Sequence, residues 1–369
     1  MKFCVLSSLS SRSGSSIRNR GICGALGALG HEVDYSEPCG PEGSPGAEGF
    51  RLHRLSGRFS APALWVLPAL CANLALLRAV RPGAVMVMKP FPHTALPALL
   101  ARALYGSRVA ADFDDLDSGY ASGPLARRVI EAMQLFFLKR ADTVCVHNAA
   151  LREYLVARGI PGARVTTLAQ GITPEKYGPP RQLPELPAGW DRAVTLVYAA
   201  HLGPAAALGP LLEIFAGLGV RYRLLVIGGG ELQPELERKA EALGVKDRVR
   251  FTGYLPHEEA LAYMRRGSIA VNFLLSHEPR DRYRSQIKVR EYLALGLPVV
   301  SSRGGDIELF GDFVEIAEDA GDFARKVEAV AADPAAAARR AAAGRDWVLK
   351  NFAWPAVTAA WLREAGLER

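Results

Sequence analysis

The chain alternates short apolar runs with longer amphipathic stretches, and this alternation limits the possible folds more than any other feature of the sequence. Short apolar runs predict buried strands, and the stretches between them predict crossover helices, as in parallel α/β sheets. In the first half, strands are expected at residues 3–7, 32–35, 84–88, 108–112, 143–147 and 164–168. Helices are expected between them, notably at residues 16–29, 95–105, 124–139 and 149–158. The fold class is therefore α/β.

A segment rich in proline and glycine divides the chain. Residues 178–190 read GPPRQLPELPAGW, and neither a helix nor a strand can continue through its four prolines and two glycines. The alternation then restarts, with strands expected at residues 193–199, 222–227, 249–252, 269–273, 298–301 and 313–316. At 369 residues the chain also exceeds the usual size of a single core. We expect two Rossmann-like doubly wound domains, at residues 1–180 and 181–350, and a C-terminal helix within residues 351–369.

The charge balance bears on the partner. Forty-five basic and 38 acidic side chains leave a net charge of +7, which favours an anionic partner such as a nucleotide, a phosphate or an acidic lipid headgroup. A plain basic surface would have the same balance. The arginines are scattered among predicted helices, so no nucleic acid is expected.

The five cysteines are odd in number and lack metal-ligand spacing, and residues 1–7 do not resemble a signal peptide. A cytoplasmic protein with reduced thiols is expected.

One apolar segment bears on membrane contact. Residues 61–77 read APALWVLPALCANLALL, carry no charge and are flanked by Arg58 and Arg78. This length is only the lower limit for crossing a bilayer, and Pro68 and Asn73 interrupt the run. We expect a helix that packs on the sheet. The alternative is docking on a membrane surface, which would make the protein peripheral at the inner face of the membrane.

A serine- and glycine-rich loop follows the first expected strand. The run SSLSSRSGSSIRNRG leads into a helix near Gly14 and Ser15. Free backbone N–H groups at such a helix start attract anions, although capping by serine would explain the same residues. The run contains no G-x-G-x-x-G fingerprint, which disfavours a nicotinamide-dependent dehydrogenase.

Residues 285–302 form a more informative segment, SQIKVREYLALGLPVVSS. It predicts an N-capped helix, a stop at Gly296 and a buried strand. Lys288 and Glu291 are three residues apart and therefore lie on one face of the helix. Lys288 suits a diphosphate, and Glu291 suits the hydroxyls of a ribose. The alternative is a surface Lys–Glu ion pair.

The same segment resembles the donor-binding helix and strand of the retaining GT-B glycosyltransferases of family four. Other runs follow in that family's order, and they are SGSSIRNRGICGALGALGHEV, RADTVCVHNAALREYLVARGI, LAQGITPEKYGP, LLVIGGGELQPELE, VRFTGYLPHEEALAYM and NFAWPAVTAAWL. The resemblance spans nearly the whole chain. It implies two Rossmann-like domains facing across a cleft, with the acceptor on the first, the donor on the second, and a last helix that crosses back to the first.

The resemblance also implies the donor site residue by residue. Phosphate contacts are expected from the Gly14 loop and Lys288, ribose contacts from Glu291, and nucleobase contacts from the backbone near Tyr254. The glycines from Gly228 to Gly230 would shape the loop above the donor, or only turn the chain. The donor-binding residues expected are Gly14, Ser15, His201, Gly229, Gly230, Tyr254, Arg284, Ser285, Lys288 and Glu291.

Three positions depart from the family pattern. The E-x7-E pair is incomplete, because Tyr283 stands eight residues before Glu291, and Glu278 is the nearest acid upstream. After the first strand of the second domain, where the family has an arginine and a lysine, the sequence reads AAHLGPAAALG. His201 stands near the arginine position, and no lysine follows. Loss of these cations would weaken stabilisation of the leaving diphosphate. Replacement charge could come from Arg280, Arg282 and Arg284, unless these form only a solvated loop.

Acidic residues follow the fourth expected strand, in the run Asp112-Phe-Asp114-Asp115-x-Asp117. At the carboxyl end of a strand they could bind a metal, orient acceptor hydroxyls or stabilise positive charge at the anomeric carbon, or else only cap a helix. Asp114 and Asp115 are the candidate catalytic residues, together with His93 in KPFPHTALPA. A structural role is the alternative for His93. No metal site is expected.

These features predict transfer of a sugar from a nucleotide diphosphate sugar, UDP-linked, to an unidentified glycan, lipid-linked or small-molecule acceptor. The resemblance implies that the configuration of the sugar is retained. No cofactor or protein nucleophile is required, because the leaving phosphate helps to take the acceptor's proton after domain closure excludes water. A nucleotide-sugar 2-epimerase would share the fold. A non-catalytic sugar-nucleotide or glycan binding module would fit the lost cations. A glycoside hydrolase would need a pair of carboxylates that the sequence does not place.

Overall fold

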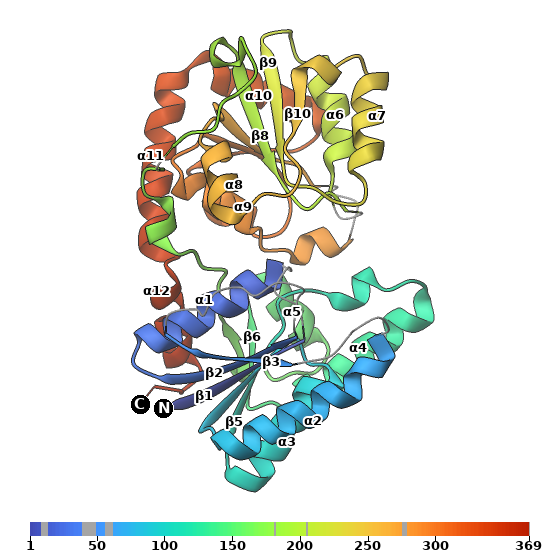
Figure 1. The fold of residues 1–369 in the computed structure, drawn as a ribbon, viewed down its shortest axis with the longest axis vertical. Helices are drawn as coiled ribbons and strands as arrows, with labels where there is room; N and C mark the ends of the chain where they lie inside the picture. The colour runs from blue at the N-terminus through green and yellow to red at the C-terminus, as the bar shows by residue number, and fades with distance from the viewer. Residues whose placement is uncertain are drawn as a thin grey trace. The chain divides into compact units, whose positions relative to one another are not determined.

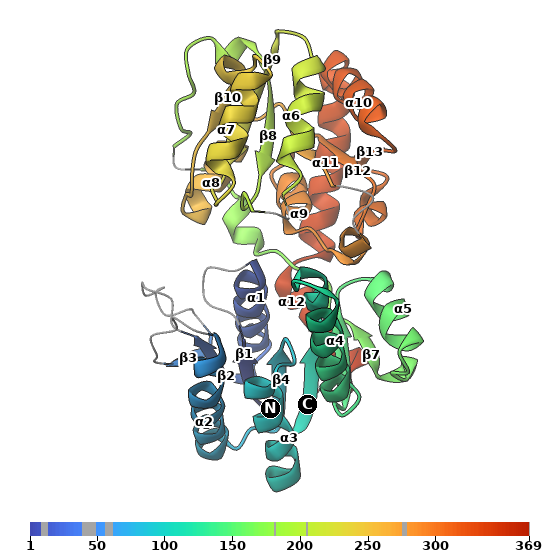
Figure 2. The same cartoon turned by 90° about the vertical axis from the view of Figure 1, so that its right-hand side faces the viewer.

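The computed structural model describes residues 1–8, 14–38, 49–55, 62–180, 182–203, 206–274 and 279–368. The chain forms two compact units (Figure 1, Figure 2). Unit 1 comprises Met1–Gly171 and Phe352–Arg369, and unit 2 comprises Ile172–Asn351. Each unit contains one parallel sheet, so the predicted pair of Rossmann-like α/β domains is confirmed. The proline-rich segment 178–190, expected to be a linker, lies within unit 2.

The sheet of unit 1 has seven strands in the order β3-β2-β1-β4-β5-β6-β7. They are β1 (Lys2–Ser7), β2 (Glu32–Pro38), β3 (Arg51–Leu55), β4 (Ala84–Met88), β5 (Arg108–Asp112), β6 (Thr143–Val146) and β7 (Val165–Thr167). All six strands expected in this half form, and β3 is additional. Its sequence, RLHRL, is only partly buried because β3 is an edge strand, so no apolar run marks it.

Helices cover both faces of this sheet. They are α1 (Gly14–Ala28), α2 (Pro62–Val80), α3 (Pro92–Tyr105), α4 (Pro124–Leu138), α5 (Ala149–Ala157) and α12 (Trp354–Glu364). Figure 1 shows α1 and α12 on one side of the sheet and α2, α3 and α4 on the other. The last helix, α12, packs against α1 and β7. Its Trp361 is fully buried and donates a hydrogen bond to Thr166 Oγ1 over 3.2 Å, so the C-terminal helix belongs to unit 1.

The apolar segment 61–77 lies mainly in α2, which packs along α3. Asn73, the polar residue within it, is buried and hydrogen-bonded. It accepts from Ser36 Oγ over 2.7 Å and donates to the carbonyl of His93 over 2.8 Å. Among the residues that the structure describes, no helix has the length and apolar character needed to cross a membrane.

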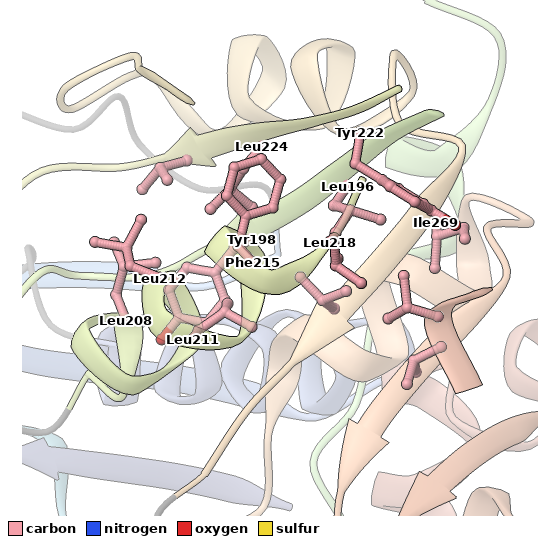
Figure 3. Close-up of a cluster of buried hydrophobic side chains, with 14 of the residues drawn as sticks. Leu196, Tyr198, Leu208, Leu211, Leu212, Phe215, Leu218, Tyr222, Leu224 and Ile269 are labelled. Carbon is pink, nitrogen blue, oxygen red and sulfur yellow. The ribbon is translucent and has the colours of Figure 1, made fainter. Parts of the chain in front are cut away.

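The sheet of unit 2 has six strands in the order β10-β9-β8-β11-β12-β13. They are β8 (Val194–Ala199), β9 (Tyr222–Ile227), β10 (Val249–Phe251), β11 (Ile269–Asn272), β12 (Val299–Ser302) and β13 (Val314–Ala317). The helices are α6 (Leu208–Gly217), α7 (Gln233–Ala242), α8 (His257–Met264), α9 (Ile287–Ala294), α10 (Ala320–Ala332) and α11 (Pro334–Asn351). Figure 3 shows leucines and Phe215 of α6 packed with Tyr198 and Leu224 in the core of this unit.

In both sheets the strand order reverses beside the first strand of the unit. The reversal lies between β1 and β4 in unit 1 and between β8 and β11 in unit 2. Connections leave in opposite directions at such a point, which opens a crevice at the carboxyl ends of the strands. The candidate functional residues lie at these ends.

Candidate active site

A small cavity with a positively charged lining lies at the carboxyl ends of β8 and β11, and we call it the cationic cavity. Its volume is about 180 Å³. Its lining residues are Tyr198, Ala200, His201, Ala206, Phe273, Leu274, Arg284 and Lys288. Arg284 and Lys288 can both carry a positive charge in this small space, which favours a ligand with phosphate groups.

Lys288 lies in the first turn of α9, with its Nζ 4.4 Å from the centre of the Tyr198 ring. Burial, and then the charge of Arg284, lower the pKa of Lys288 to about 7. Arg284 is itself half-buried, and its Nη1 lies 3.1 Å from Asp281 Oδ1. Because an arriving anion would favour the charged amine, Lys288 is suited to take up a proton on binding a phosphate.

A second cavity, the apolar cavity, adjoins the first. Its volume is about 190 Å³. It is lined by Ala199, Ala200, His201, Ile227, Gly228, Tyr254, Leu255, Ala260 and Met264. The two cavities share Ala200 and His201, so a ligand with a planar apolar group next to an anionic group could occupy both.

His201 is held between two side chains. Its Nδ1 makes a hydrogen bond of 2.5 Å with the hydroxyl of Tyr254, and the two rings stack with centroids 6.0 Å apart. Its Nε2 lies 3.2 Å from Glu231 Oε2. Tyr254 is 69 % exposed, so this stacked pair forms an accessible wall of the apolar cavity.

The glycine loop after β9 is shaped by close packing. Gly228 has φ +115°, and a β-carbon there would collide with the carbonyl oxygen of Ala200. A β-carbon on Gly230 would collide with the Leu202 carbonyl, and one on Gly229 would lie 3.1 Å from Tyr254. The backbone at this loop therefore approaches the segment after β8 closely enough to require glycine.

Glu291 is buried on α9 and already has protein partners. Its Oε1 lies 2.7 Å from His257 Nε2 and accepts a hydrogen bond from the Tyr177 hydroxyl over 3.3 Å. Burial, and then the Glu291 charge, raise the pKa of Tyr177 above its ordinary range. These two partners fix the position of the carboxylate. Sequence reasoning missed both, although they lie in the runs GITPEKYG and LPHEEAL.

The start of α9 corrects one expectation. Ser285 does not cap the helix, because α9 begins at Ile287 and its N-cap, Gln286, makes no side-chain cap bond. Ser285 Oγ instead donates to Asp306 Oδ2 over 2.6 Å, and the buried Arg290 donates to the same oxygen over 2.6 Å. Ser285 therefore helps to hold the loop after β12 against the start of α9.

In unit 1 the acidic run after β5 is largely neutralised. Asp112 is fully buried and accepts hydrogen bonds from Arg18 of 2.8 and 2.9 Å. Asp114 lies 3.4 Å from the buried Lys89 Nζ, and Asp117 is ion-paired with the same amine. Burial alone would lower the pKa of Lys89, but the charges of Asp114 and Asp117 raise it above its ordinary value.

The other candidates in unit 1 have local roles in this structure. Asp115 Oδ1 accepts a hydrogen bond from the backbone N–H of Leu116 over 2.8 Å. His93 is buried beside Trp65, with ring centroids 4.5 Å apart, and burial lowers the pKa of His93 to about 4. Its imidazole is therefore neutral near pH 7. Neither ring nitrogen has a hydrogen-bond partner among the described residues.

Some expected residues lie outside the described parts. Gly14 and Ser15 begin α1, but the surroundings of both residues, and residues 9–13, are outside the description. Glu278 and the side chain of Arg280 are also outside it. Within the described residues, no group of three or more His, Cys, Asp or Glu side chains is arranged to hold a metal ion.

Two family models match the chain. The "Glycosyl transferase 4-like domain" matches residues 13–171, and "Glycosyl transferases group 1" matches residues 193–333. The chain belongs to the group 1 glycosyltransferases of the GT-B fold. Its sequence is 30 % identical over 255 residues to a glycogen synthase of Mycobacterium tuberculosis, covering 66 % of this chain and 58 % of that protein. It is 28 % identical to a GDP-mannose-dependent α-(1-6)-phosphatidylinositol monomannoside mannosyltransferase of Mycolicibacterium smegmatis, covering 70 % of each.

Solved structures share the fold of this group 1 glycosyltransferase. Sucrose-phosphate synthase of Thermosynechococcus elongatus superposes with a TM-score of 0.77 at 19 % identity, covering 98 % of this chain and 97 % of that one. HepE of Anabaena, solved in complex with UDP-glucose, superposes with a TM-score of 0.75 at 14 % identity over the whole of both chains.

The departures from the family pattern can now be placed in the glycosyltransferase. Tyr283 ends a short 3-10 turn (Pro279–Tyr283) and is half-buried. Arg284, the next residue, lines the cationic cavity with Lys288 and His201. A cation therefore stands in the cavity even though the usual arginine and lysine after β8 are absent.

Proposed function

We propose that this chain transfers a sugar from a nucleotide diphosphate sugar, with UDP as the nucleotide, to an acceptor hydroxyl, and that it retains the configuration of the sugar. The observation that carries the proposal is the pair of joined cavities at the carboxyl ends of β8, β9 and β11. One is apolar and one is cationic, which matches the order of base and diphosphate in a nucleotide. HepE, which shares the fold, was solved with UDP-glucose.

In this proposal the base enters the apolar cavity beside Tyr254, and the diphosphate lies against Lys288 and Arg284. Charge-assisted hydrogen bonds from these cations would bind the diphosphate of the donor. They would also stabilise the negative charge that grows on the leaving phosphate. Glu291, positioned by His257 and Tyr177, would accept hydrogen bonds from the ribose.

The proposed chemistry needs no protein nucleophile. The acceptor oxygen forms a bond to the anomeric carbon on the face from which the diphosphate leaves, and the acceptor proton passes to the leaving phosphate. On unit 1, Asp114 with its partner Lys89, Asp115 and His93 are the polar groups proposed to meet the acceptor. Retention is proposed from the family resemblance.

Calorimetric titration with UDP, GDP and ADP tests the donor site. We expect UDP to bind, and Lys288→Ala and Arg284→Ala each to weaken binding about thirtyfold, because a hydrogen bond to a charged group contributes about 2 kcal/mol. Glu291→Ala should also weaken binding. Lys246→Ala is the matched control, because Lys246 is exposed in the same unit and pairs with Glu241. Equal binding of UDP by all four variants would refute the assigned site.

A second measurement separates catalysis from simple binding. A glycosyltransferase should slowly release UDP and free sugar from a UDP-sugar, and NMR of the first-formed sugar should show the donor's anomeric configuration. UDP binding with no turnover would favour the binding module, for which Tyr283 and the missing cations after β8 are the supporting observations. Formation of a sugar epimerised at C2 would instead indicate a 2-epimerase.

A further inference from the structure

The carboxylate of Glu291 has one oxygen that is fully used within the protein. Its Oε1 lies 2.7 Å from His257 Nε2 and accepts a hydrogen bond from the Tyr177 hydroxyl over 3.3 Å. An ionised carboxylate only accepts hydrogen bonds, so Nε2 of His257 is the donor in this pair. A carboxylate oxygen has two lone-pair positions, and the two donors occupy both of them on Oε1.

The other oxygen of Glu291, Oε2, is open. It accepts no hydrogen bond from any residue that the structure describes, and it is not one of the fully buried polar atoms that lack a partner. Glu291 as a whole is 5 % exposed, so a ligand reaches its side chain over a small area. The carboxylate therefore offers a ligand one acceptor oxygen and not two.

Both donors to Oε1 are held in place by their own surroundings. Tyr177 is 4 % exposed, and Arg265 donates hydrogen bonds to its carbonyl over 2.8 Å and to the carbonyl of Gly178 over 2.5 Å. His257 is the first residue of α8, and Arg265 directly follows the last. Helix α8 thus fixes both partners of Glu291, and Oε1 is occupied before any ligand binds.

This carboxylate lies beside both cavities of the proposed donor site. Ala260 and Met264, three and seven residues after His257 on the same face of α8, line the apolar cavity. Lys288, one turn before Glu291 on α9, lines the cationic cavity. The His257–Glu291 contact therefore joins the helices of the two cavities. A nucleotide with its base in one cavity and its diphosphate in the other would bring its ribose to this contact.

A ribose presents two neighbouring hydroxyls, and an unoccupied carboxylate can accept one of them on each oxygen. In this protein one hydroxyl can donate to Oε2 of Glu291 without breaking any bond. The other hydroxyl could donate to Oε1 only by displacing His257 or Tyr177. One hydrogen bond to the charged oxygen would then replace another, so the second hydroxyl adds almost nothing to the binding free energy.

We propose that Glu291 binds a single ribose hydroxyl, and that His257 and Tyr177 determine this selectivity by occupying Oε1. The proposal rests on the proposed donor site and adds a positioning role for two residues. Its consequence is an unequal response to the two hydroxyls. A nucleotide that lacks one of them binds almost as well as UDP, and a nucleotide that lacks the other binds poorly.

Calorimetric titration of the full chain with UDP, 2′-deoxy-UDP and 3′-deoxy-UDP tests this proposal. One deoxy nucleotide should bind about tenfold to a hundredfold more weakly than UDP, because a hydrogen bond to a charged oxygen is lost. The dissociation constant of the other should stay within about threefold of the UDP value, because its missing hydroxyl only exchanges one bond for another.

The variant Tyr177→Phe keeps the buried ring and frees one lone pair of Oε1. The second hydroxyl then gains a bond without displacing a donor, so both deoxy nucleotides should bind this variant about tenfold or more weakly than UDP does. His257→Ala should have the same effect, whereas His257→Gln retains a donor and should behave as the wild type. Tyr222→Phe is the matched control, because it removes another buried tyrosine hydroxyl of unit 2, which accepts from Arg221 over 2.9 Å.

Ratios of dissociation constants separate this role from a purely structural one. A loss of folding would weaken all three nucleotides alike and leave their ratios unchanged. Equal losses for the two deoxy nucleotides in the wild type, or ratios that Tyr177→Phe and His257→Ala leave unchanged, would overturn the proposal while UDP binding still supported the donor site. If UDP itself did not bind, the donor site would be refuted and this proposal with it.

Discussion

Burial, and then the like charge of Arg284, disfavour the charged form of the Lys288 amine in the cationic cavity. A bound diphosphate would reverse this effect by supplying negative charge. The protonation state of Lys288 is therefore coupled to nucleotide binding in the proposed site.

This coupling predicts a pH dependence of UDP affinity. With its pKa lowered to about 7, Lys288 is increasingly neutral above that pH and must take up a proton to bind phosphate. Between roughly pH 7 and 9 the diphosphate stays fully ionised, so affinity should fall as pH rises, by up to about tenfold per unit. Calorimetry at several pH values, in buffers of different ionisation enthalpy, would measure both the affinity and the proton uptake.

The matched variant is Lys288→Arg, whose guanidinium stays charged over this range, so its affinity should be nearly independent of pH. A wild-type affinity that is equally flat would contradict the coupling.

At the scale of elements, the glycine turn after β9 packs on the segment that lines both cavities. Gly228 approaches the carbonyl of Ala200, which lines both of them, and Gly230 approaches that of Leu202. The shape of the proposed donor site therefore depends on one backbone turn as well as on charged side chains.

Gly228→Ala should both destabilise unit 2 and abolish nucleotide binding. The new β-carbon would meet a backbone oxygen at φ +115°, a combination that should cost about 2–3 kcal/mol or displace the turn. Urea unfolding and UDP titration would measure the two effects. Gly217→Ala is the control, since open space surrounds that glycine at the end of α6, and it should leave both properties nearly unchanged. An unaltered UDP affinity in Gly228→Ala would show that the turn does not shape the site.

At the scale of the whole molecule, the last residues of the chain, Phe352–Arg369, pack in the same unit as the first 171. The Trp354 ring lies where β-carbons of Gly21 and Gly171 would otherwise be, so these glycines form a niche for it. Trp361 is buried against β7. Residues more than 150 positions apart in sequence thus share one core, and the C-terminal helix completes it.

Trp361→Ala should therefore weaken unit 1 selectively. Loss of a fully buried tryptophan typically costs about 3–5 kcal/mol, and hydrogen exchange should accelerate in β1, β6 and β7 while β8 and β9 stay protected. Trp347→Ala in α11 is the reciprocal control, because Trp347 packs on Phe310 and Phe313 of unit 2. Equal acceleration in both units after Trp361→Ala would be inconsistent with two separately stabilised units.

The sequence by itself determined the two parallel sheets, most of their strands and the positions of Lys288 and Glu291 on one helix. These features depend on the spacing of apolar and polar residues within short stretches of the chain, which the sequence shows directly. The edge strand β3 was missed because its half-exposed residues have no apolar run to mark them.

Only the tertiary structure decided which distant groups meet. Glu291 is held by His257, 34 residues away, and by Tyr177, 114 residues away, and no spacing rule connects such positions. The same holds for Lys89, which neutralises Asp114 and Asp117, and for the two cavities joined at His201. Strand order and packing bring these residues together, because contacts across a sheet depend on which connections cross and not on distance along the chain.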